Sequence, residues 1–304
     1  MAVNRIAVLG LGRMGAAVAA ALVLAGRDVV VWNRSESGHD RLAGELDLRA
    51  PHPQRATTPA QAVLGADLVL TSLADGAALR DVLTGPDGAL GAARPGTVVA
   101  DTSTVGVATA RDLAATAAAA GIVYCDAPVS GSVASVRSAS LLVLAGGPED
   151  AVERLREVTR PFAAAVVHTG AVGSGQAAKL AVNAVVYGLN AAVAEALVLA
   201  ERGGVPRDTA LEIFTSSAVA APLVRYKRAA FADLDAEPVA MSVDLMRKDL
   251  RLIAEQAELT GSSLPLTERV LSVADEVSSA GRGSSDMAAV AAHLRDRAGA
   301  EPPR

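Results

Sequence analysis

The sequence predicts an α/β fold, a doubly wound sheet followed by an all-α C-terminal domain. Three observations predict it. Short apolar runs alternate with helix-forming segments over residues 1–169, a glycine-rich turn joins the first run to the first helix, and no strand-like run follows residue 170. Alternating strands and helices with right-handed crossovers give a mostly parallel sheet. We therefore expect a first domain over residues 1–169 and a helical domain over residues 170–304.

Length and composition are consistent with two soluble domains. The chain has 304 residues, of which 51% are hydrophobic and only 2% aromatic, so alanine, valine and leucine must fill the cores. A chain of this length is more than one compact core ordinarily holds. The formal net charge is −5, without a block of lysine or arginine, which argues against a nucleic-acid partner.

Cysteine and histidine usage excludes two kinds of cross-link. The single Cys125 cannot form an intramolecular disulfide and suits a reducing compartment, so we expect a cytoplasmic protein. The four histidines show no metal-ligand spacing with one another or with Cys125. They are His39, His52, His168 and His293. We therefore expect no metal site.

The N-terminal segment predicts a dinucleotide-binding unit. An apolar strand at Arg5–Leu9 runs into a glycine turn, a helix follows from Met14 to Ala25, and a second strand is expected at Val29–Trp32. This is the size of a dinucleotide-binding βαβ unit, in which glycines let the backbone approach a pyrophosphate at the helix N-terminus. The alternative is a glycine turn without a ligand. The predicted cofactor-binding residues of this Rossmann-type unit are Gly10, Leu11, Gly12, Arg13, Met14 and Gly15.

The rest of the first domain continues the alternation. Further strands are expected at Asp67–Ser72, Thr97–Ala100, Ile122–Cys125, Ser140–Ala145 and Ala164–His168, with helices at Gly76–Leu83, Val105–Ala120 and from Pro148 to Thr159. Loops after the carboxyl ends of such strands line the ligand crevice. Leu73, the turn Asp101–Thr104 and the turn Ser130–Ser132 should therefore surround one site.

Beyond residue 170 the signals are helical. Helices are expected at Pro206–Thr215, Met241–Leu259, Pro265–Ala280 and Asp286–Ala298. A longer helix is expected from Gln176 to Glu201, because this run has no proline, one glycine and apolar residues at every helical offset, which predicts burial on most faces. The window 181–200 is long enough to span a bilayer, but its two asparagines and one glutamate favour a buried interdomain or subunit-interface helix. We expect no membrane contact.

Lys179 is the candidate catalytic residue of that helix. Lys179 and Asn183 are four residues apart and share one face. A lysine on such a helix either extends to water or lies in a pocket, where desolvation lowers its pKa toward neutrality. Taken alone, the helix favours an ordinary surface lysine. The pair Lys248–Asp249 likewise has a plain interpretation as a solvated charge pair.

The loop after the second strand indicates which dinucleotide is bound. An NAD site usually places Asp or Glu about 20 residues beyond the glycine turn, where its carboxylate would repel a 2′-phosphate. This chain has Asn33 there, followed by Arg34 and Ser35, which suit charge-assisted hydrogen bonds to that phosphate. The alternative is that Arg34 is solvated and Ser35 caps the next helix. We expect NADP(H), with NAD less favoured.

Taken together, the motifs resemble the β-hydroxyacid dehydrogenase family, whose members act on 3-hydroxyisobutyrate and short semialdehydes. The resemblance covers nearly the whole chain and rests on five motifs in order. They are Gly-Leu-Gly-Arg-Met-Gly at 10–15, Asp-Thr-Ser-Thr at 101–104, Asp-Ala-Pro-Val-Ser-Gly at 126–131, Gly-Ser-Gly-Gln-Ala-Ala-Lys at 173–179 with Asn183, and Lys-Asp-Leu at 248–250.

The resemblance implies roles for particular residues. Lys179 would be the catalytic lysine, Asn183 its substrate-orienting neighbour, and Thr104 and Lys248 would contact the cofactor. Leu73 is expected to contact the cofactor from its place after a strand end. Ser130, Gly131 and Ser132 would bind the substrate carboxylate, through backbone N–H groups suited to an anion. It further implies a homodimer or homotetramer built on the helical domain.

Departures from the family pattern bear on which acid is bound. Ser132 follows Gly131 where a second glycine is usual, Val182 precedes Asn183 where a second asparagine is usual, and the loop after Thr104 lacks a proline. Three other functions remain open at this point. They are an imine reductase, which usually lacks the lysine, 6-phosphogluconate dehydrogenase, which is much longer, and a non-catalytic dinucleotide-binding protein.

Overall fold

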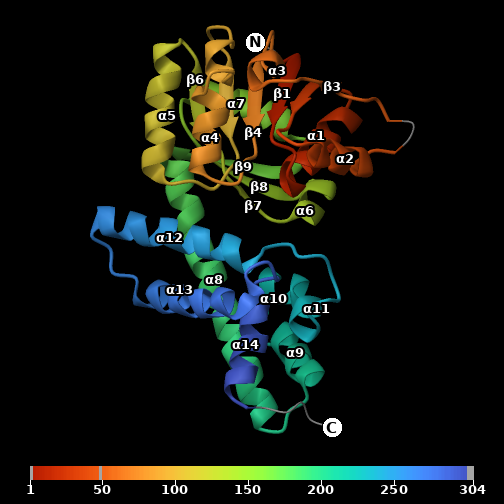
Figure 1. Ribbon diagram of the computed structural model, residues 1–304, viewed down its shortest axis with the longest axis vertical. Helices are drawn as coiled ribbons and strands as arrows, with labels where there is room; N and C mark the ends of the chain where they lie inside the picture. Colours follow the sequence, from red (N-terminus) through yellow and green to blue (C-terminus); the bar gives the residue numbers. More distant parts are fainter. Residues whose placement is uncertain (1–2, 48–49, 300–304) are drawn as a thin grey trace. The chain divides into compact units, whose positions relative to one another are not determined.

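The computed structural model describes residues 3–47 and 50–299 and divides into two compact units, residues 1–179 and 180–304 (Figure 1). The division falls inside the long helix α8 (Ser174–Arg202), whose first turns pack with the sheet of the first unit. The boundary expected from the sequence, between residues 169 and 170, precedes this helix.

A mostly parallel sheet forms the centre of the first unit, in the order β3-β2-β1-β4-β5-β6-β8-β7, with β9 paired to β8. The six strands from β3 to β6 in this sheet order, β1 and β2 included, are parallel to one another. Strand β8 runs antiparallel to β6 and β7. The strands are β1 (Arg5–Leu9), β2 (Asp28–Trp32), β3 (Gln54–Arg55), β4 (Leu68–Thr71), β5 (Val98–Asp101), β6 (Val123–Asp126), β7 (Val129–Ser130), β8 (Leu141–Gly146) and β9 (Ala163–Gly170). The short β3 and β7 have no clear signal in the sequence.

Helices cover both faces of this sheet, as a doubly wound fold requires (Figure 1). They are α1 (Arg13–Leu24), α2 (Glu36–Glu45), α3 (Pro59–Ala62), α4 (Gly76–Thr84), a 3₁₀ turn η1 (Ala89–Gly91), α5 (Val107–Ala119), α6 (Val133–Arg137) and α7 (Glu149–Thr159). Alternate residues of β1 belong to different cores, with Ile6 and Val8 in one cluster and Ala7 and Leu9 in the other. Both sheet faces are therefore buried, which explains the continuous apolar runs.

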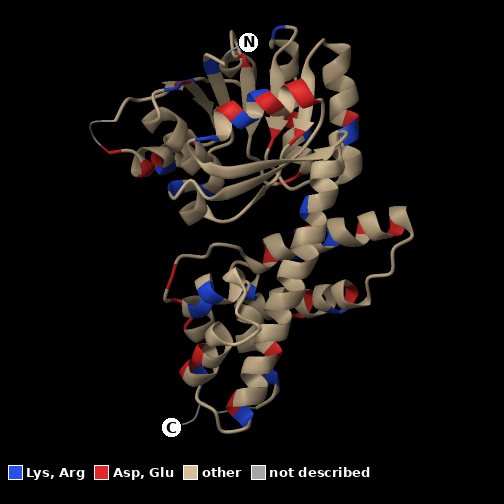
Figure 2. Cartoon of the chain, turned by 180° about the vertical axis from the view of Figure 1, so that it is seen from behind, with Lys and Arg blue, Asp and Glu red and all other residues tan. Residues whose placement is uncertain are grey.

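The second unit is helical. Besides most of α8, it contains α9 (Arg207–Ser216), α10 (Pro222–Tyr226), α11 (Arg228–Ala232), α12 (Val243–Thr260), α13 (Pro265–Val277), a π-helical segment η2 (Ser278–Arg282) and α14 (Ala289–Arg297). The last helix, α14, begins at Ala289, three residues later than the expected start at Asp286. Asp286 is not its first residue, because this buried carboxylate pairs with Lys227 and accepts N–H groups of Ala240 and Ala288. Figure 2 shows acidic and basic residues interspersed along the chain of both units.

The expectation that α8 is buried on most faces was wrong for the single chain. Only 33% of its most apolar window is buried, and Val185 and Leu199 are 70% and 75% exposed. By length and composition alone this helix is able to cross a membrane, which is weak evidence because core helices of soluble proteins meet the same criterion. One apolar face of α8 therefore has no cover within the described chain.

Candidate functional site

The glycine turn brings the chain close to the neighbouring strand. Gly10 has φ +98°, and a Cβ there would lie 2.3 Å from the Ser72 carbonyl oxygen. A Cβ on Gly15 would lie 2.0 Å from the Gly10 oxygen, so α1 packs against the turn only if this residue is glycine. A Cβ on Gly12, at the N-cap of α1, would meet nothing within 4 Å. The helix N-terminus is thus open on the side where a phosphate would approach.

The loop after β2 is fixed to this turn by Asn33. Its Oδ1 accepts the Leu11 N–H at 2.8 Å, and its Nδ2 donates to the Ser35 carbonyl oxygen at 2.8 Å. Ser35 occupies the N-cap position of α2 but makes no side-chain cap bond. The interpretation of its hydroxyl as a helix cap was therefore wrong, because Ser35 Oγ faces Asn33 Nδ2 at 3.3 Å and Ser37 Oγ at 2.9 Å instead.

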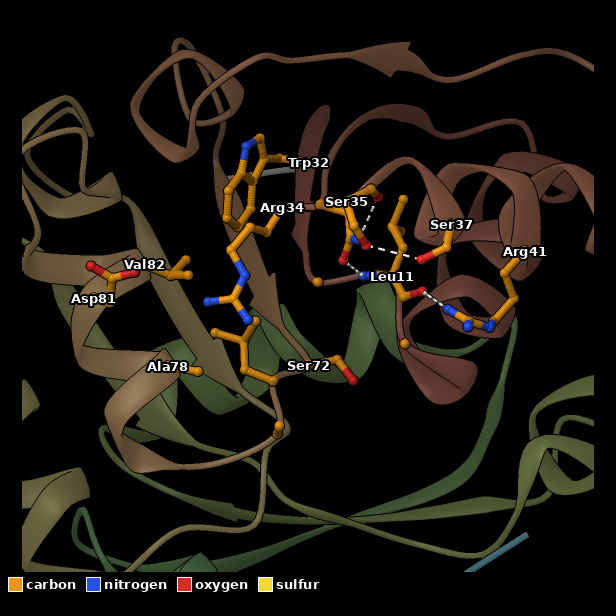
Figure 3. Close-up of a pocket in the computed structure, with 15 residues that line it drawn as sticks. Leu11, Trp32, Arg34, Ser35, Ser37, Arg41, Ser72, Ala78, Asp81 and Val82 are labelled. Atoms are coloured by element: carbon orange, nitrogen blue, oxygen red, sulfur yellow. Dashed lines mark hydrogen bonds between the residues drawn. The ribbon is translucent and has the colours of Figure 1, made fainter. Parts of the chain in front are cut away.

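These segments form one wall of a cleft of about 270 Å³ (Figure 3). Arg34 extends across it below Trp32, toward Ala78 of α4 (Figure 3). Of the predicted cofactor residues, seven line it, namely Gly10, Leu11, Gly12, Asn33, Arg34, Ser35 and Leu73. Arg13, Met14 and Gly15 form the first turn of α1 and do not line this cleft. An open helix N-terminus and a cation in one cleft fit a dinucleotide.

Sequence reasoning missed several lining residues. They are Trp32, Ser37, Arg41, Ser72, Ala74, Ala78, Asp81 and Val82. Arg41 had a usable signal, because it lies on α2 four residues after Ser37, and it donates to the Leu11 carbonyl oxygen at 2.7 Å. No signal in the sequence indicates the lining residues of α4, because only the packing of α4 beside β4 brings them to the cleft.

A buried carboxylate organises the carboxyl ends of β4 and β5. Asp101 Oδ1 accepts the Thr71 hydroxyl at 2.6 Å and the Ser103 N–H at 3.0 Å, and Oδ2 accepts the Tyr124 hydroxyl at 3.3 Å. Ser103 Oγ in turn accepts the Leu73 N–H at 2.9 Å. The loops carrying Leu73 and Ser103 therefore meet as expected. Burial raises the pKa of Asp101 to about 6, against the opposing effect of these hydrogen bonds.

This pKa predicts a pH-dependent stability. Because the folded chain holds the Asp101 proton to about pH 6 while an unfolded chain releases it near 3.8, stability from this group is lost as pH rises through that window. Relative to wild type, the free energy of unfolding of Asp101→Asn should therefore rise by about 2 kcal/mol between pH 4 and pH 7, measured by urea denaturation. Asp67→Asn is the opposite control. Burial raises the pKa of Asp67, but the backbone N–H groups of Arg5 and Asn4, together with the charges of Arg94 and Arg154, outweigh it and lower that pKa.

The predicted carboxylate cradle spans the end of β7 and the start of α6. Ser130 ends β7, Gly131 has φ +134°, and Ser132 is the N-cap of α6. The Ser132 N–H donates to Ser135 Oγ at 3.1 Å within a capping box. That N–H is therefore engaged, so a carboxylate at this turn would use the serine hydroxyls or the Gly131 N–H.

Asn183 belongs to a buried network of the second unit. Asp249 Oδ2 accepts the Tyr187 hydroxyl at 2.6 Å and Asn183 Nδ2 at 2.9 Å. Lys248 Nζ lies 3.0 Å from Asp249 Oδ1. Asp249 is only 2% exposed, so its interpretation as part of a solvated pair was wrong. Because a carboxylate only accepts, Nδ2 must face it, which directs the Asn183 carbonyl oxygen to the other side.

The remaining predicted residues lie on separate elements. Lys179 is half-buried in the second turn of α8, on the same helical face as Asn183. Thr104 lies in the loop between β5 and α5, and Lys248 on α12 of the second unit. Within residues 3–47 and 50–299, no group of three or more His, Cys, Asp or Glu side chains is placed to hold a metal ion.

Comparison with known proteins identifies the family. Residues 5–170 match the NAD-binding domain of 6-phosphogluconate dehydrogenase, and residues 173–294 match the domain described as NAD-binding of NADP-dependent 3-hydroxyisobutyrate dehydrogenase. A probable 3-hydroxyisobutyrate dehydrogenase of Mycobacterium bovis is 35% identical, over 97% of this chain and 99% of that protein.

The chain belongs to the β-hydroxyacid dehydrogenase family.

Two further relatives agree with this membership. The 2-(hydroxymethyl)glutarate dehydrogenase of Eubacterium barkeri is 30% identical, over 94% of this chain and 93% of that protein. The solved structure of 3-hydroxyisobutyrate dehydrogenase of Mycobacterium tuberculosis with L-serine has a TM-score of 0.83 at 34% identity, covering 97% and 100% of the two chains. This β-hydroxyacid dehydrogenase is therefore an NAD(P)-dependent oxidoreductase acting on a CH–OH group, and the expected family and fold class are confirmed.

Proposed function

We propose that this enzyme interconverts a small β-hydroxy acid and its semialdehyde with NADP(H), and that Lys179 is the general acid and base. One observation carries the proposal. The first unit places a cleft suited to a phosphorylated dinucleotide at the carboxyl edge of its sheet, and the N-terminal turns of α8, with Lys179, pack with that same unit.

The chemistry follows from charge. The dinucleotide, when bound, supplies or accepts a hydride at the substrate carbon. In the reductive direction, negative charge develops on the carbonyl oxygen, and an ammonium at Lys179 would stabilise this charge and donate the proton. In the oxidative direction the neutral amine would accept the hydroxyl proton. Asn183, with its amide orientation fixed by Asp249, would present its carbonyl oxygen as an acceptor, which suits the substrate hydroxyl in the oxidative direction.

Preference for NADP(H) rests on the cleft. The acidic residue typical of NAD sites is replaced by Asn33, whose side chain braces the loop. Arg34 supplies a cation in the cleft, with the Ser35 hydroxyl on the same loop and the Ser37 hydroxyl in the first turn of α2. A guanidinium with hydroxyl donors suits a 2′-phosphate and gives little benefit to a ribose hydroxyl.

The substrate class is drawn from what the relatives share. 3-Hydroxyisobutyrate, 2-(hydroxymethyl)glutarate and L-serine, named for the relatives, all carry a hydroxymethyl group on the carbon that bears a carboxylate. A turn of two serines and a glycine at 130–132 is suited to the carboxylate common to all three. We infer that the substrate of this enzyme has the same hydroxymethyl-carboxylate core.

The proposal is tested by a substrate panel. Purified enzyme is assayed with NADP or NAD and 3-hydroxyisobutyrate, L-serine, 2-(hydroxymethyl)glutarate or 6-phosphogluconate. In the reverse direction it is assayed with NADPH and short semialdehydes or cyclic imines. Turnover should be highest for a hydroxymethyl carboxylate or its semialdehyde. Reduction of cyclic imines without turnover of any acid would instead indicate an imine reductase, and oxidation of 6-phosphogluconate alone would indicate that activity.

The exposed face of α8 fits the expected oligomer. Val185 and Leu199 are large apolar side chains exposed in the single chain, and burial of such side chains favours association by roughly 1.5 to 3 kcal/mol each. We infer that a second copy of the chain covers this face in a homodimer or homotetramer. Light scattering of wild type and of Val185→Glu/Leu199→Glu checks this, with the variant expected to dissociate.

A further inference from the structure

The N-terminus of α8 is held by a carboxylate from a distant strand. Asp126 ends β6 and is fully buried. Its Oδ1 accepts the Gly173 N–H and its Oδ2 accepts the Gln176 N–H, both at 2.7 Å. These are N–H groups that a helix leaves unsatisfied in its first turn, and a negative charge there also interacts favourably with the helix dipole.

Gln176 makes a second attachment from the same turn. Its side chain is fully buried, with Oε1 accepting the Val105 N–H at 3.2 Å and Nε2 donating to the Ser103 carbonyl oxygen at 2.8 Å. Both partners lie in the loop that follows β5. The first turn of α8 is therefore attached to two neighbouring strand ends, which fixes its rotation about the helix axis as well as its height above the sheet.

Two glycines allow this close approach. A Cβ on Gly175 would lie 2.5 Å from the Leu144 carbonyl oxygen and 2.7 Å from that of Asp126. A Cβ on Gly146 would lie 2.6 Å from Asp126 Oδ1. Backbone thus rests on backbone where α8 meets the sheet, so that even a methyl group at either position would push the helix away.

We propose that Asp126 and Gln176 are positioning residues, which set the place of the Lys179 ammonium in the site by fixing the first turn of α8. Gln176 precedes Lys179 by three residues, so both lie on one helical face. A rotation of this turn would displace the Lys179 side chain directly. The inference rests on the proposed role of Lys179. Misplacement of a reacting group by about 1 Å costs on the order of 10²-fold in rate.

The test compares Asp126→Asn, Gln176→Met and a matched control. The Asn side chain keeps the shape but presents an NH₂ group to an N–H donor. Each variant should lower kcat by about 10- to 100-fold while the Kd for NADPH changes less than about twofold. The control is Asp67→Asn, because Asp67 also accepts two backbone N–H groups, of Asn4 at 2.8 Å and Arg5 at 3.1 Å, but at the amino end of β4. Its kcat should match wild type.

A double-mutant cycle separates positioning from general damage. In the Lys179→Ala background, Asp126→Asn should lower the residual rate no further, because the group it positions is gone. Wild-type kcat in Asp126→Asn and Gln176→Met, with Lys179→Ala inactive, would overturn the positioning role and leave the proposed function intact. Near-normal turnover of Lys179→Ala would instead remove the proposed function. If Asp126→Asn does not fold, Gln176→Met decides alone, and an equal loss in Asp67→Asn would also overturn the inference.

Discussion

Replacing Lys179 with alanine is expected to lower kcat by about 10²- to 10⁴-fold, which is the usual contribution of general acid–base catalysis. The Kd for NADPH and the melting temperature should stay near wild type, because Lys179 does not line the dinucleotide cleft and is only half-buried. Steady-state kinetics, NADPH fluorescence titration and thermal unfolding of the same preparation measure the three quantities. Turnover near the wild-type rate would contradict the assignment.

Lys179→Arg distinguishes proton transfer from charge stabilisation. A guanidinium keeps the positive charge but does not release its proton at accessible pH. The arginine variant should therefore bind a carboxylate substrate normally and still turn over slowly. Recovery of most of the rate would mean that Lys179 acts by charge alone.

The chain offers an internal control for this experiment, because it contains only three lysines, Lys179, Lys227 and Lys248. Lys227 is buried against Asp286, and removing one partner of a buried ion pair typically costs about 3 to 5 kcal/mol of stability. Lys227→Met should therefore lower the melting temperature without changing kcat of the folded enzyme. Lys179→Ala should therefore lower kcat and keep the melting temperature, whereas Lys227→Met should lower the melting temperature and keep kcat.

Arg34→Ala is expected to weaken NADPH binding by about 10- to 150-fold and to leave NADH binding nearly unchanged. Hydrogen bonds to a charged group contribute roughly 1.5 to 3 kcal/mol, and only NADPH carries the 2′-phosphate that Arg34 would meet. Fluorescence titration of both cofactors against wild type and variant measures the difference. Equal losses for both, or a wild-type preference for NADH, would contradict this interpretation of the loop.

Arg55→Ala is the matched control for charge. Arg55 lies on β3, is paired with Glu36 at 3.4 Å and is largely exposed, and it does not line the cleft. Removing it changes the net charge by the same amount as Arg34→Ala. The affinity for NADPH should therefore fall far less than in Arg34→Ala, because Arg55 does not line the cleft and its charge is already paired with Glu36.

Local signals were sufficient for most of the fold. The strand, glycine turn and helix over residues 5–24 form where the pattern places them, because a glycine with φ +98° at Gly10 and an apolar run are properties of the local chain. Short elements were not foreseen, such as β7 and α10, because a few residues carry too little periodicity and their structure depends on neighbouring elements.

The residues of the dinucleotide cleft were predictable only in part, because some of them reach it through the packing of elements distant in the sequence. Asn33, Arg34 and Ser35 follow the strand β2 directly, so sequence spacing alone brings them beside the glycine turn. Asp81 and Val82 reach the same cleft from α4, and no spacing in the sequence indicates how α4 packs.

The sequence by itself determined the family, the sheet with its dinucleotide turn, and the helix that carries Lys179 and Asn183 on one face. Only the tertiary structure decided that Asp126 caps that helix from β6, and that Asp249 is buried beneath Asn183 instead of solvated. The physical reason is how far apart along the chain the interacting residues lie. Turns and periodicity are fixed by neighbours along the chain, whereas a carboxylate finds its donors 47 to 66 residues away only after the chain has folded.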